Sequence, residues 1–490
     1  MSEQAFHALV HAARLRVVVA NLAQLLVMLG LLAAAPALVA LALGPEILFQ
    51  RLGLTAAALA LGGLVLLRLP GLDISRTDLQ WNEALSVTAL AFLVAAAGMV
   101  WPLTATGIDP LDALLEAVSG VTTTGLTVLR DPDVAYPSLL FLRAWMQWYG
   151  GLGIAVLAVA LIVRHHGSAR RLLETTGEEL TSAGARHHAR TVFTVYALLT
   201  VLVLAAVTAT GVAPFQALLY ALPAVATGGF APSADSLAPL PLAAVAVLTV
   251  AMLLGAVTLP LYARLPARGP GVLWRDPEVR ALVVAVLLTG LLVGGLIAWQ
   301  QGRPWAESLG HGLALGVSAQ SDTGFSTLDV AALPPAAQLV LMLSMTAGGC
   351  TGSTAGGLKL IRVLVLLRLV QLALRRTAVA ERAVLHARVG RDRVSPEMIS
   401  GALQLLALWL AVLIVSWLLF LVYGQSPMAS LFEVVSATAN AGLSMGLTGP
   451  DLAPALKLVL IADMLFGRVE VLALLVLLYY PTWIGRRRKT

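Results

Sequence analysis

Ten apolar stretches dominate this sequence, and each is near or above the ~20 residues that an α-helix needs to cross a bilayer. They cover residues 19–44, 52–69, 84–103, 138–163, 191–212, 239–264, 279–299, 335–374, 400–423 and 455–483. The mean hydropathy is +0.88 and 12% of the residues are charged, against roughly 25% in soluble domains. We therefore expect an all-α polytopic membrane protein embedded in a lipid bilayer.

An even number of crossings places both chain ends on one side of the membrane. Arginine and histidine gather in residues 164–174, 185–190, 375–393 and 485–490, and the positive-inside rule assigns such loops to the cytoplasm. We therefore expect a multi-pass protein of the cell inner (plasma) membrane with both termini cytoplasmic. The basic runs are interpreted as topology signals with no nucleic-acid partner, and a surface for a cytoplasmic protein partner stays open.

Several classes of protein are excluded or disfavoured. The polar start runs directly into an apolar span too long for a signal peptide, so no cleavable signal is expected. A single cysteine, Cys350, excludes an internal disulfide and a cysteine-based metal cluster. A membrane enzyme would need a nucleophile–base pair or a metal cluster at one depth, and none is evident, so we expect no enzyme. No span carries the regularly spaced arginines of a voltage sensor.

Four short mixed segments repeat along the chain, each between two apolar spans. They are "VSGVTTTGLT" (118–127), "LPAVATGGFA" (222–231), "VSAQSDTGFS" (317–326) and "VSATANAGLS" (435–444). In each, a small or polar run leads to a glycine, and a large apolar residue follows it. The shared glycines are Gly125, Gly229, Gly324 and Gly442.

Prolines indicate where the helices before these segments begin. Pro110, Pro214 and Pro427 each lie 15 residues before their glycine, and proline suits the first position of a helix. Asp109 and Ser426 are expected to cap two of these helices. In the third repeat Pro304 lies 20 residues away, so we expect that helix to begin later, around Glu307 or Ser308.

The length of these helices limits how far they reach. About 11 helical residues cover ~16 Å, roughly half of a ~30 Å hydrocarbon core. Each segment is therefore expected to be a re-entrant half-helix followed by an extended loop. The domain organisation expected is an N-terminal two-helix extension (1–75), repeat 1 (76–172), repeat 2 (173–268), repeat 3 with a broken second helix (269–394) and repeat 4 (395–490).

Four such loops in register predict a site for a monovalent cation. A single loop would also fit tight helix packing or a coupled transporter. Four around one axis place their carbonyl oxygens around a central hole, as in potassium filters, and glycine permits the backbone conformations required. The expected K⁺ ligands are the backbone of Thr122, Thr123, Thr124, Gly125, Ala226, Thr227, Gly228, Gly229, Ser321, Asp322, Thr323, Gly324, Ala439, Asn440, Ala441 and Gly442.

Asp322 departs from the other repeats, because the equivalent positions carry Thr123, Thr227 and Asn440. An ionised side chain beside the ion path would strengthen cation binding or shift selectivity. A place behind the loop, in a hydrogen-bond network, is an equal alternative.

The chain as a whole resembles the TrkH/KtrB-type subunits of bacterial potassium uptake systems. The resemblance includes the four loops, "WMQWYGGLGIAVLAVAL" (145–161), "GGCTGSTAGGLKLIRV" (348–363) and "FGRVEV" (466–471). The two extra N-terminal helices are similar to the TrkH branch. The resemblance implies a pseudo-fourfold arrangement of repeats, a homodimer with a pore in each protomer, and gating by a cytoplasmic TrkA-like nucleotide-binding subunit.

The Gly-rich stretch 346–359 interrupts a span otherwise long enough to cross the membrane. Its glycine, serine and threonine residues cannot hold a regular helix by propensity alone. We expect a mobile loop below the filter, with a kink for close helix packing as the alternative. A phosphate-binding loop is disfavoured because the GK[ST] ending is missing. The expected gating residues here are Gly348, Gly349, Gly352, Ser353, Thr354, Gly356, Gly357 and Lys359.

Asp463, Arg468 and Glu470 lie inside the last apolar span, where ionisable groups are paired or functional. The resemblance favours Arg468 facing the pore below the filter, where it would limit cation passage. An ion pair that serves assembly alone is the alternative. Glu116 and Glu433, each nine residues before its glycine, are expected either to add negative charge to the outer vestibule or to anchor the half-helices.

Together these features predict uptake of K⁺ down its electrochemical gradient. An H⁺- or Na⁺-coupled symporter on the same scaffold is the nearest alternative, and the sequence does not distinguish the two.

Overall fold

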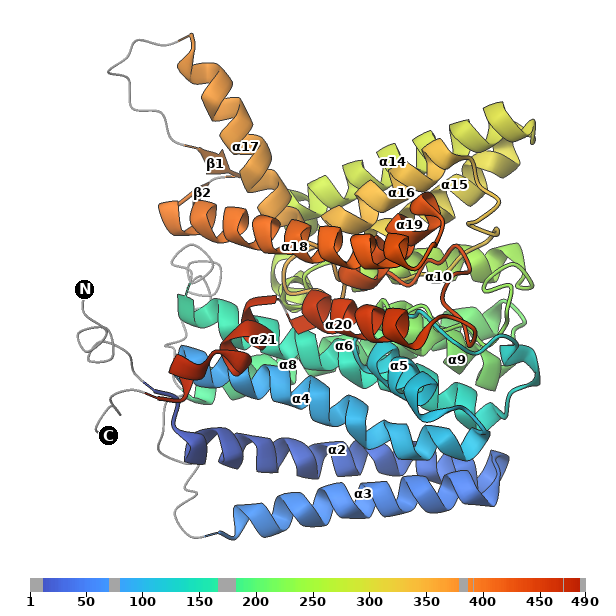
Figure 1. The fold of residues 1–490 in the computed structure, drawn as a ribbon. Helices are drawn as coiled ribbons and strands as arrows, with labels where there is room; N and C mark the ends of the chain where they lie inside the picture. Colours follow the sequence, from blue (N-terminus) through green and yellow to red (C-terminus); the bar gives the residue numbers. More distant parts are fainter. Residues whose placement is uncertain are drawn as a thin grey trace.

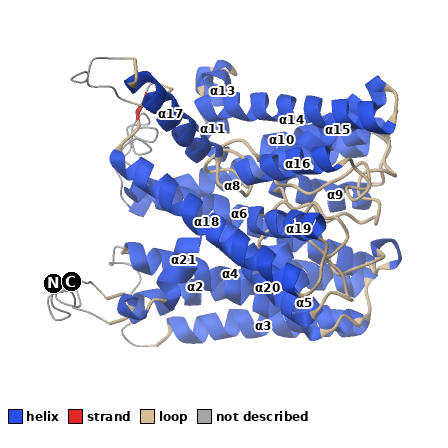
Figure 2. Ribbon diagram, turned by 45° about the horizontal axis from the view of Figure 1, so that its top comes forward, coloured by secondary structure: helices blue, strands red, loops and turns tan. Residues whose placement is uncertain are grey.

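Helices dominate the computed structural model, which describes residues 12–69, 80–165, 182–378, 387–390, 392–469 and 471–484 (Figures 1 and 2). A backbone in lipid must satisfy its own hydrogen bonds, and helices do so. The longer elements are α2 (Leu15–Leu43), α3 (Glu46–Leu67), α4 (Trp81–Leu103), α5 (Pro110–Val121), α6 (Pro137–His165), α8 (Ser182–Ala209), α9 (Pro214–Ala226), α10 (Leu242–Gly255), α14 (Pro277–Gln301), α15 (Trp305–Gln320), α16 (Pro335–Ala347), α17 (Leu360–Arg376), α18 (Pro396–Val422), α19 (Pro427–Ala439), α20 (Pro454–Val469) and α21 (Val471–Leu478).

Short elements connect them. They are η1 (Thr104–Thr106), η2 (Pro132–Val134), α11 (Leu259–Tyr262), α12 (Leu265–Arg268), α13 (Gly271–Arg275), η3 (Tyr480–Thr482) and the antiparallel strands β1 (Arg388–Val389) and β2 (Asp392–Arg393).

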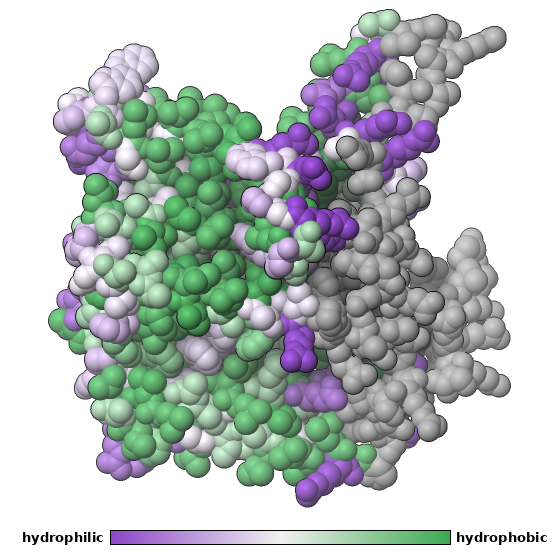
Figure 3. All heavy atoms as spheres, turned by 180° about the vertical axis from the view of Figure 1, so that it is seen from behind, coloured by the Kyte–Doolittle hydropathy of each residue, from purple (hydrophilic) through white to green (hydrophobic). Residues whose placement is uncertain are grey.

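Six of the described helices are long and apolar enough to cross a bilayer: Leu15–Leu43, Glu46–Leu67, Trp81–Thr106, Ala189–Ala209, Pro277–Gln301 and Pro396–Val422. Seen from behind, the molecule carries a broad apolar surface between two more hydrophilic ends (Figure 3). These observations confirm the expected multi-pass helical membrane protein.

The N-terminal pair α2 and α3 lies at one edge of the bundle (Figure 1), where α2 also packs on α4 and α6. The two ends of the described chain meet at one end of the molecule. There the backbone N–H of Ala13 donates to the carbonyl of Thr482 at 2.8 Å. This contact agrees with an even number of crossings.

The remaining helices form four units that close into a ring. Each unit has a first helix (α4, α8, α14 or α18), a half-helix (α5, α9, α15 or α19), a loop and a second helix (α6, α10, α16 or α20). Every half-helix packs on the first helix of its own unit. Every second helix packs on the half-helix of the next unit: α6 on α9, α10 on α15, α16 on α19 and α20 on α5. The last pair connects the fourth unit back to the first.

Prolines begin the half-helices as expected, but the caps differ. Pro110, Pro214 and Pro427 occupy the first turn of α5, α9 and α19, whereas the side chains of Asp109 and Ser426 make no capping hydrogen bond. Both residues occupy the expected N-cap positions of α5 and α19, but their side chains do not satisfy the free N–H groups of the first turn. The backbone carbonyl of Ser426 accepts a hydrogen bond from the hydroxyl of Ser430 at 2.6 Å.

The expected late start of the third half-helix was also wrong. Helix α15 begins at Trp305, directly after Pro304 at the N-cap, and has 16 residues. Its extra first turn is exposed, and Glu307 there faces Arg303 at 3.4 Å and His311 at 3.8 Å. Side-chain pairs at this spacing support a helical turn that has little burial.

The second helices of the second and third units are broken. The apolar span 335–374 divides into α16 and α17 around residues 348–359, as expected. The span 239–264, expected to be one helix, ends as α10 at Gly255 and continues as the short α11 and α12. The carbonyls of Gly255 and Ala256 at this break accept hydrogen bonds from the N–H groups of Thr354 and Cys350, so contacts with residues 348–359 replace the next helical turn.

Glycines permit the tight crossing of α14 and α15, and this can be tested. A Cβ added at Gly312 would lie 2.5 Å from the Gly290 carbonyl and 2.6 Å from Gly294 Cα. Because backbone cannot move aside as a side chain can, we expect Gly312→Ala to destabilise the protein by about 1–3 kcal/mol, measured as a lower thermal midpoint in detergent. Gly310→Ala on the same helix is the control, since nothing lies within 4 Å of a Cβ there. Equal midpoints for both variants would contradict the crossing.

Candidate functional site

The four loops meet backbone to backbone in a closed ring. We call residues 122–125, 226–229, 321–324 and 439–442 the ring loops. A Cβ added at each shared glycine would lie under 3.0 Å from a carbonyl oxygen of the next loop, a distance that real Cβ atoms do not show. The pairs are Gly125 with Gly228, Gly229 with Thr323, Gly324 with Ala441, and Gly442 with Thr124. The sequence-predicted ligand residues are therefore brought together at one place.

All four ring loops share one backbone conformation. The shared glycines have φ of +92°, +77°, +90° and +79° in chain order. The residue two before each glycine is also left-handed, with φ of +55° at Thr123, +51° at Thr227, +54° at Asp322 and +56° at Asn440. The residue directly before each glycine donates its N–H to the carbonyl of the residue five positions earlier, at 2.9 Å in every repeat. The half-helices thus end by one repeated turn.

This second left-handed position was not predicted. Threonine is β-branched and rarely adopts positive φ, so Thr123 and Thr227 are held there against their preference, at a cost on the order of 1–3 kcal/mol each. Such strain persists only where the surroundings impose it. The sequence signal was the polar residue at this position in all four repeats.

Hydroxyl groups bridge the backs of two loops. Thr122 donates to the Val118 carbonyl at 2.7 Å and lies 2.7 Å from the Thr124 hydroxyl. The Ser321 and Thr323 hydroxyls repeat this 2.7 Å contact in the third loop. These residues are almost fully buried, so the bridges lie within the protein.

Gln147, which sequence analysis did not single out, positions the second ring loop from α6. Its Nε2 donates to the Gly228 carbonyl and its Oε1 accepts the N–H of Phe230 at 3.0 Å. The side chain is fully buried. One amide therefore fixes the peptide groups on both sides of Gly229.

Glu116 and Glu433 anchor the segments that leave the ring. Glu116 accepts hydrogen bonds from the Thr127 hydroxyl and, at 2.7 Å, from the N–H of Val128. Glu433 accepts the N–H groups of Met445 at 2.9 Å and Leu447 at 3.2 Å, with hydroxyls of the same segment. Both carboxylates are fully buried, so of the two expected roles the geometry shows anchoring.

Two buried ion pairs lie at this level, one within the first unit and one between the fourth unit and the first. Arg143 donates to Glu116 at 3.0 Å, and its guanidinium lies 4.0 Å from the ring centre of Phe230 in the next unit. Lys457 on α20 pairs with Asp112 on α5 and also donates to the Pro450 carbonyl at 2.8 Å. The Arg143–Phe230 and Lys457–Asp112 contacts therefore join the first unit to its two neighbours.

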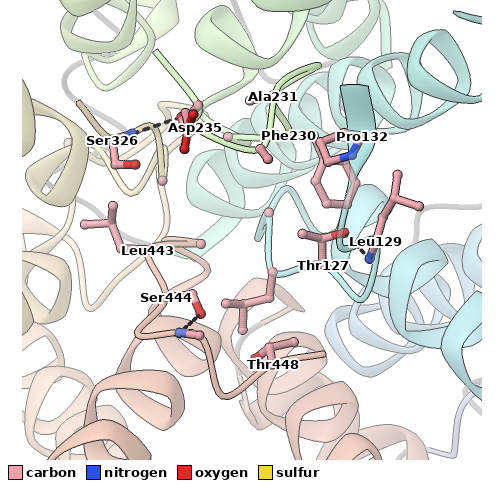
Figure 4. Close-up of a pocket in the computed structure, with 18 of the residues that line it drawn as sticks. Thr127, Leu129, Pro132, Phe230, Ala231, Asp235, Ser326, Leu443, Ser444 and Thr448 are labelled. Atoms are coloured by element: carbon pink, nitrogen blue, oxygen red, sulfur yellow. Dashed lines mark hydrogen bonds between the residues drawn. The ribbon is translucent and has the colours of Figure 1, made fainter. Parts of the chain in front are cut away.

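A cavity of about 430 Å³ lies over the ring, and the four shared glycines line it. Side chains of all four loops surround it, among them Thr127, Phe230, Ser326 and Ser444 (Figure 4).

Residues 348–359, which we call the Gly-rich loop, lie against the other side of the ring. The N–H of Gly357 donates to the Ala439 carbonyl at 2.9 Å, and Gln320 Nε2 at the end of α15 donates to the Gly348 carbonyl at 2.6 Å. The Thr354 hydroxyl lies 3.2 Å from that of Thr227 and donates to the Val225 carbonyl at 3.1 Å. The loop therefore contacts three of the four half-helix ends.

The other expected residues of this loop are placed around the same contacts. Gly349, Gly352, Ser353 and Gly356 are buried. Lys359 has a φ of +75° and donates its ammonium group to the Ala355 carbonyl. The loop is thus packed on backbone groups along its length, and the alternative of a simple helix kink does not describe it.

Arg468 crosses from α20 to this loop. Its Nη1 donates to the Thr354 carbonyl at 2.8 Å, and its Nη2 lies 3.5 Å from the Gly150 carbonyl on α6. The residue is 3% exposed. Within the described part of the chain it forms no ion pair. Glu470 lies outside the described residues, and Asp463 instead accepts the hydroxyl of Ser416 at 2.7 Å.

Asp322 is fully buried at the base of the third ring loop. Its Oδ2 faces the start of the Gly-rich loop, where a Cβ added at Gly348 would lie 3.0 Å away. Neither carboxylate oxygen has a hydrogen bond of standard geometry. Arg468 and Lys359 are near enough to act on it electrostatically. The carboxylate therefore lies between the ring and the Gly-rich loop.

Among the described residues, no group of three or more His, Cys, Asp or Glu side chains could hold a metal ion. The sequence also holds two adjacent histidine pairs, His165–His166 and His187–His188. His166 lies outside the described residues, and the side chains of the other three are not described. The ring loops therefore offer backbone oxygens rather than a side-chain cluster.

Comparison with known proteins agrees with this architecture. Residues 75–481 match the family model TrkH, a cation transport protein. The chain is 31% identical over 417 residues to the Trk system potassium uptake protein TrkH of Salmonella typhimurium, covering 83% of this chain and 84% of that protein. The TrkH of Halomonas elongata is 29% identical over 504 residues, covering 96% and 99%.

A solved structure shares the fold. The crystal structure of the potassium transporter TrkH from Vibrio parahaemolyticus matches with a TM-score of 0.85 and 27% identity, covering 96% of this chain and 100% of that chain. These relatives are named as transport proteins, which agrees with the expectation that the chain is not an enzyme. The chain belongs to the TrkH family of cation transport proteins, as its loop and helix motifs indicated.

Proposed function

We propose that this protein takes up K⁺ across the cell inner membrane through the ring of loops, down the electrochemical gradient. The observation that carries the proposal is the closed contact of four loops that share one backbone turn. Carbonyl oxygens in such a ring can replace the hydration shell of a monovalent cation. The potassium uptake activity of the named relatives supports the choice of ion.

The surroundings of the ring favour a cation. Helices α5, α9, α15 and α19 all end at the ring loops, and the C-terminus of a helix carries partial negative charge. The cavity over the ring would admit a hydrated ion from outside the cell. Asp322 would place a carboxyl group at the base of the path, and its ionised form would strengthen cation binding.

The Gly-rich loop and Arg468 would limit passage on the cytoplasmic side. The loop is seated below three half-helix ends, where it would block an ion leaving the ring. A buried arginine at this depth would raise the barrier for a cation. We propose that a cytoplasmic TrkA-like nucleotide-binding subunit releases the loop, that the protein acts as a homodimer, and that both termini are cytoplasmic.

The test of function is growth at limiting K⁺ in cells that lack their own K⁺ uptake, with and without a TrkA-like partner. We expect rescue that is stronger with the partner. ⁸⁶Rb⁺ uptake into vesicles under imposed H⁺ or Na⁺ gradients separates the alternatives. Uptake that follows only the K⁺ gradient supports a channel-like path. Uptake that follows the H⁺ or Na⁺ gradient would replace it with the coupled symporter.

Selectivity should depend on Gly229. The φ at this glycine is +77°, and a side chain would meet the Thr323 carbonyl of the next loop. We expect Gly229→Ser to lower the K⁺ over Na⁺ uptake ratio by about tenfold, the effect of ~1.4 kcal/mol of lost discrimination.

Gly211→Ser is the matched control for that substitution. Gly211 has a φ of +94° but nothing within 4 Å of a Cβ, so it carries the backbone strain without the crowding. If the uptake ratio is unchanged by Gly229→Ser in folded protein, these loops are not the filter.

Arg468 should restrict basal flux. We expect Arg468→Ala to increase cation flux in reconstituted vesicles without the partner, because it removes both the charge and the bond to Thr354. Arg468→Lys keeps a charge and should stay nearer the wild type. Unchanged or lower flux in Arg468→Ala, in protein of normal thermal midpoint, would contradict the barrier role.

A further inference from the structure

The tip of the Gly-rich loop, residues 350–352, is hydrogen-bonded to the residues that follow α10. Cys350 donates its N–H to the Ala256 carbonyl at 2.9 Å, and Leu259 donates its own to the Gly352 carbonyl at 3.2 Å. The Thr258 hydroxyl donates to the Thr351 carbonyl at 2.8 Å. One flank of the tip is therefore fixed to the end of the second unit, mostly through backbone.

A side chain holds the other flank of the tip. Glu278, in the first turn of α14, accepts the N–H of Thr351 at 2.6 Å. Helix α14 does not need this carboxylate for capping, because Asp276 already accepts the N–H groups of Glu278 at 2.8 Å and Val279 at 3.2 Å. The Glu278 carboxylate is thus available to the loop.

Helix α18 offers a direct comparison. It begins Ser395–Pro396–Glu397, as α14 begins Asp276–Pro277–Glu278, and its N-cap serine also accepts a hydrogen bond within the first turn. Glu397 is exposed and has no hydrogen bond with the Gly-rich loop. A capping residue, proline and glutamate therefore begin both helices, and of the two glutamates only Glu278 reaches the loop.

We propose that Thr258 and Glu278 form a clasp that keeps the Gly-rich loop seated under the ring, with Glu278 as its releasable arm. The proposal rests on the gating role proposed above. Glu278 holds the tip through one carboxylate, whereas the α10 side holds it through several backbone groups. A small rotation of the first turn of α14 would break the Glu278 bond and leave the other contacts intact.

The clasp also defines a route to the loop. Thr258 and Glu278 stand at the two ends of one connection, which contains α11, α12 and α13. A displacement of this connection changes both arms together. Regulation can therefore reach the loop through the link between the second and third units, as well as through α17, which continues directly from the loop.

The single cysteine of the chain reports on the clasp. Cys350 lies in the loop tip and is fully buried, so thiol modification requires the tip to leave its seat. The experiment reacts the full-length protein, reconstituted in vesicles with its cytoplasmic face outward, with a membrane-impermeant methanethiosulfonate reagent. Cys350→Ser provides the unreactive background.

We expect Glu278→Ala to speed modification of Cys350 by about tenfold, the effect of one lost hydrogen bond to a charged group. K⁺ flux without the partner should rise with it. Glu278→Gln should stay within about threefold of the wild type, because the amide oxygen still accepts the Thr351 N–H. Glu397→Ala should match the wild type.

Unchanged modification in Glu278→Ala, in protein with a normal thermal midpoint, would overturn the clasp. Equal acceleration in Glu278→Ala and Glu397→Ala would also overturn it, because a general loosening of helix ends would then explain the effect. Faster modification with no K⁺ flux in any variant would retain the clasp and count against the proposed transport function.

Discussion

Contact between peptide groups of four separate loops is the constraint on which this structure depends. At the shared glycine of each loop, a carbonyl oxygen of the next loop around the ring occupies the space that a Cβ would fill. The position of each loop therefore depends on its neighbour. The requirement extends into the second helices, where Gly150, Gly255 and Gly467 face carbonyls at the ends of half-helices under 3.0 Å from where a Cβ would lie. Close packing of backbone, rather than large apolar side chains, therefore sets the geometry at the centre.

Charged groups support that centre from outside it. Burying an ion is unfavourable unless it is paired and hydrogen-bonded. Arg143 with Glu116 meets this condition within the first unit, and Lys457 with Asp112 meets it between the fourth unit and the first. Glu433 has no cation partner within the described residues, and four donors of the following segment serve instead. The polar side chains in this apolar protein thus hold loops that helices alone could not position.

The sequence predicted the architecture because its signals were periodic: ten apolar spans, four equivalent glycines and three equivalent prolines. It did not predict contacts that join distant segments. Gln147 lies in an ordinary apolar span, and only the fold brings it to Gly228, 81 residues away. The early start of α15 depended on exposed polar pairs, and the early end of α10 depended on contacts with the Gly-rich loop. The left-handed turn at Thr123 opposed local preference, so propensity could not reveal it.

A ring made from one chain differs from a ring of identical subunits. In a homotetramer every substitution occurs four times, whereas here each quarter can change alone. The third quarter already differs, with Asp322 in its turn and Leu315 at the position that holds Glu116 and Glu433 in the first and fourth. In the proposed filter, a substitution can therefore adjust ion preference in one quarter while the other three keep their sequence, and the ring need not be symmetric to remain closed.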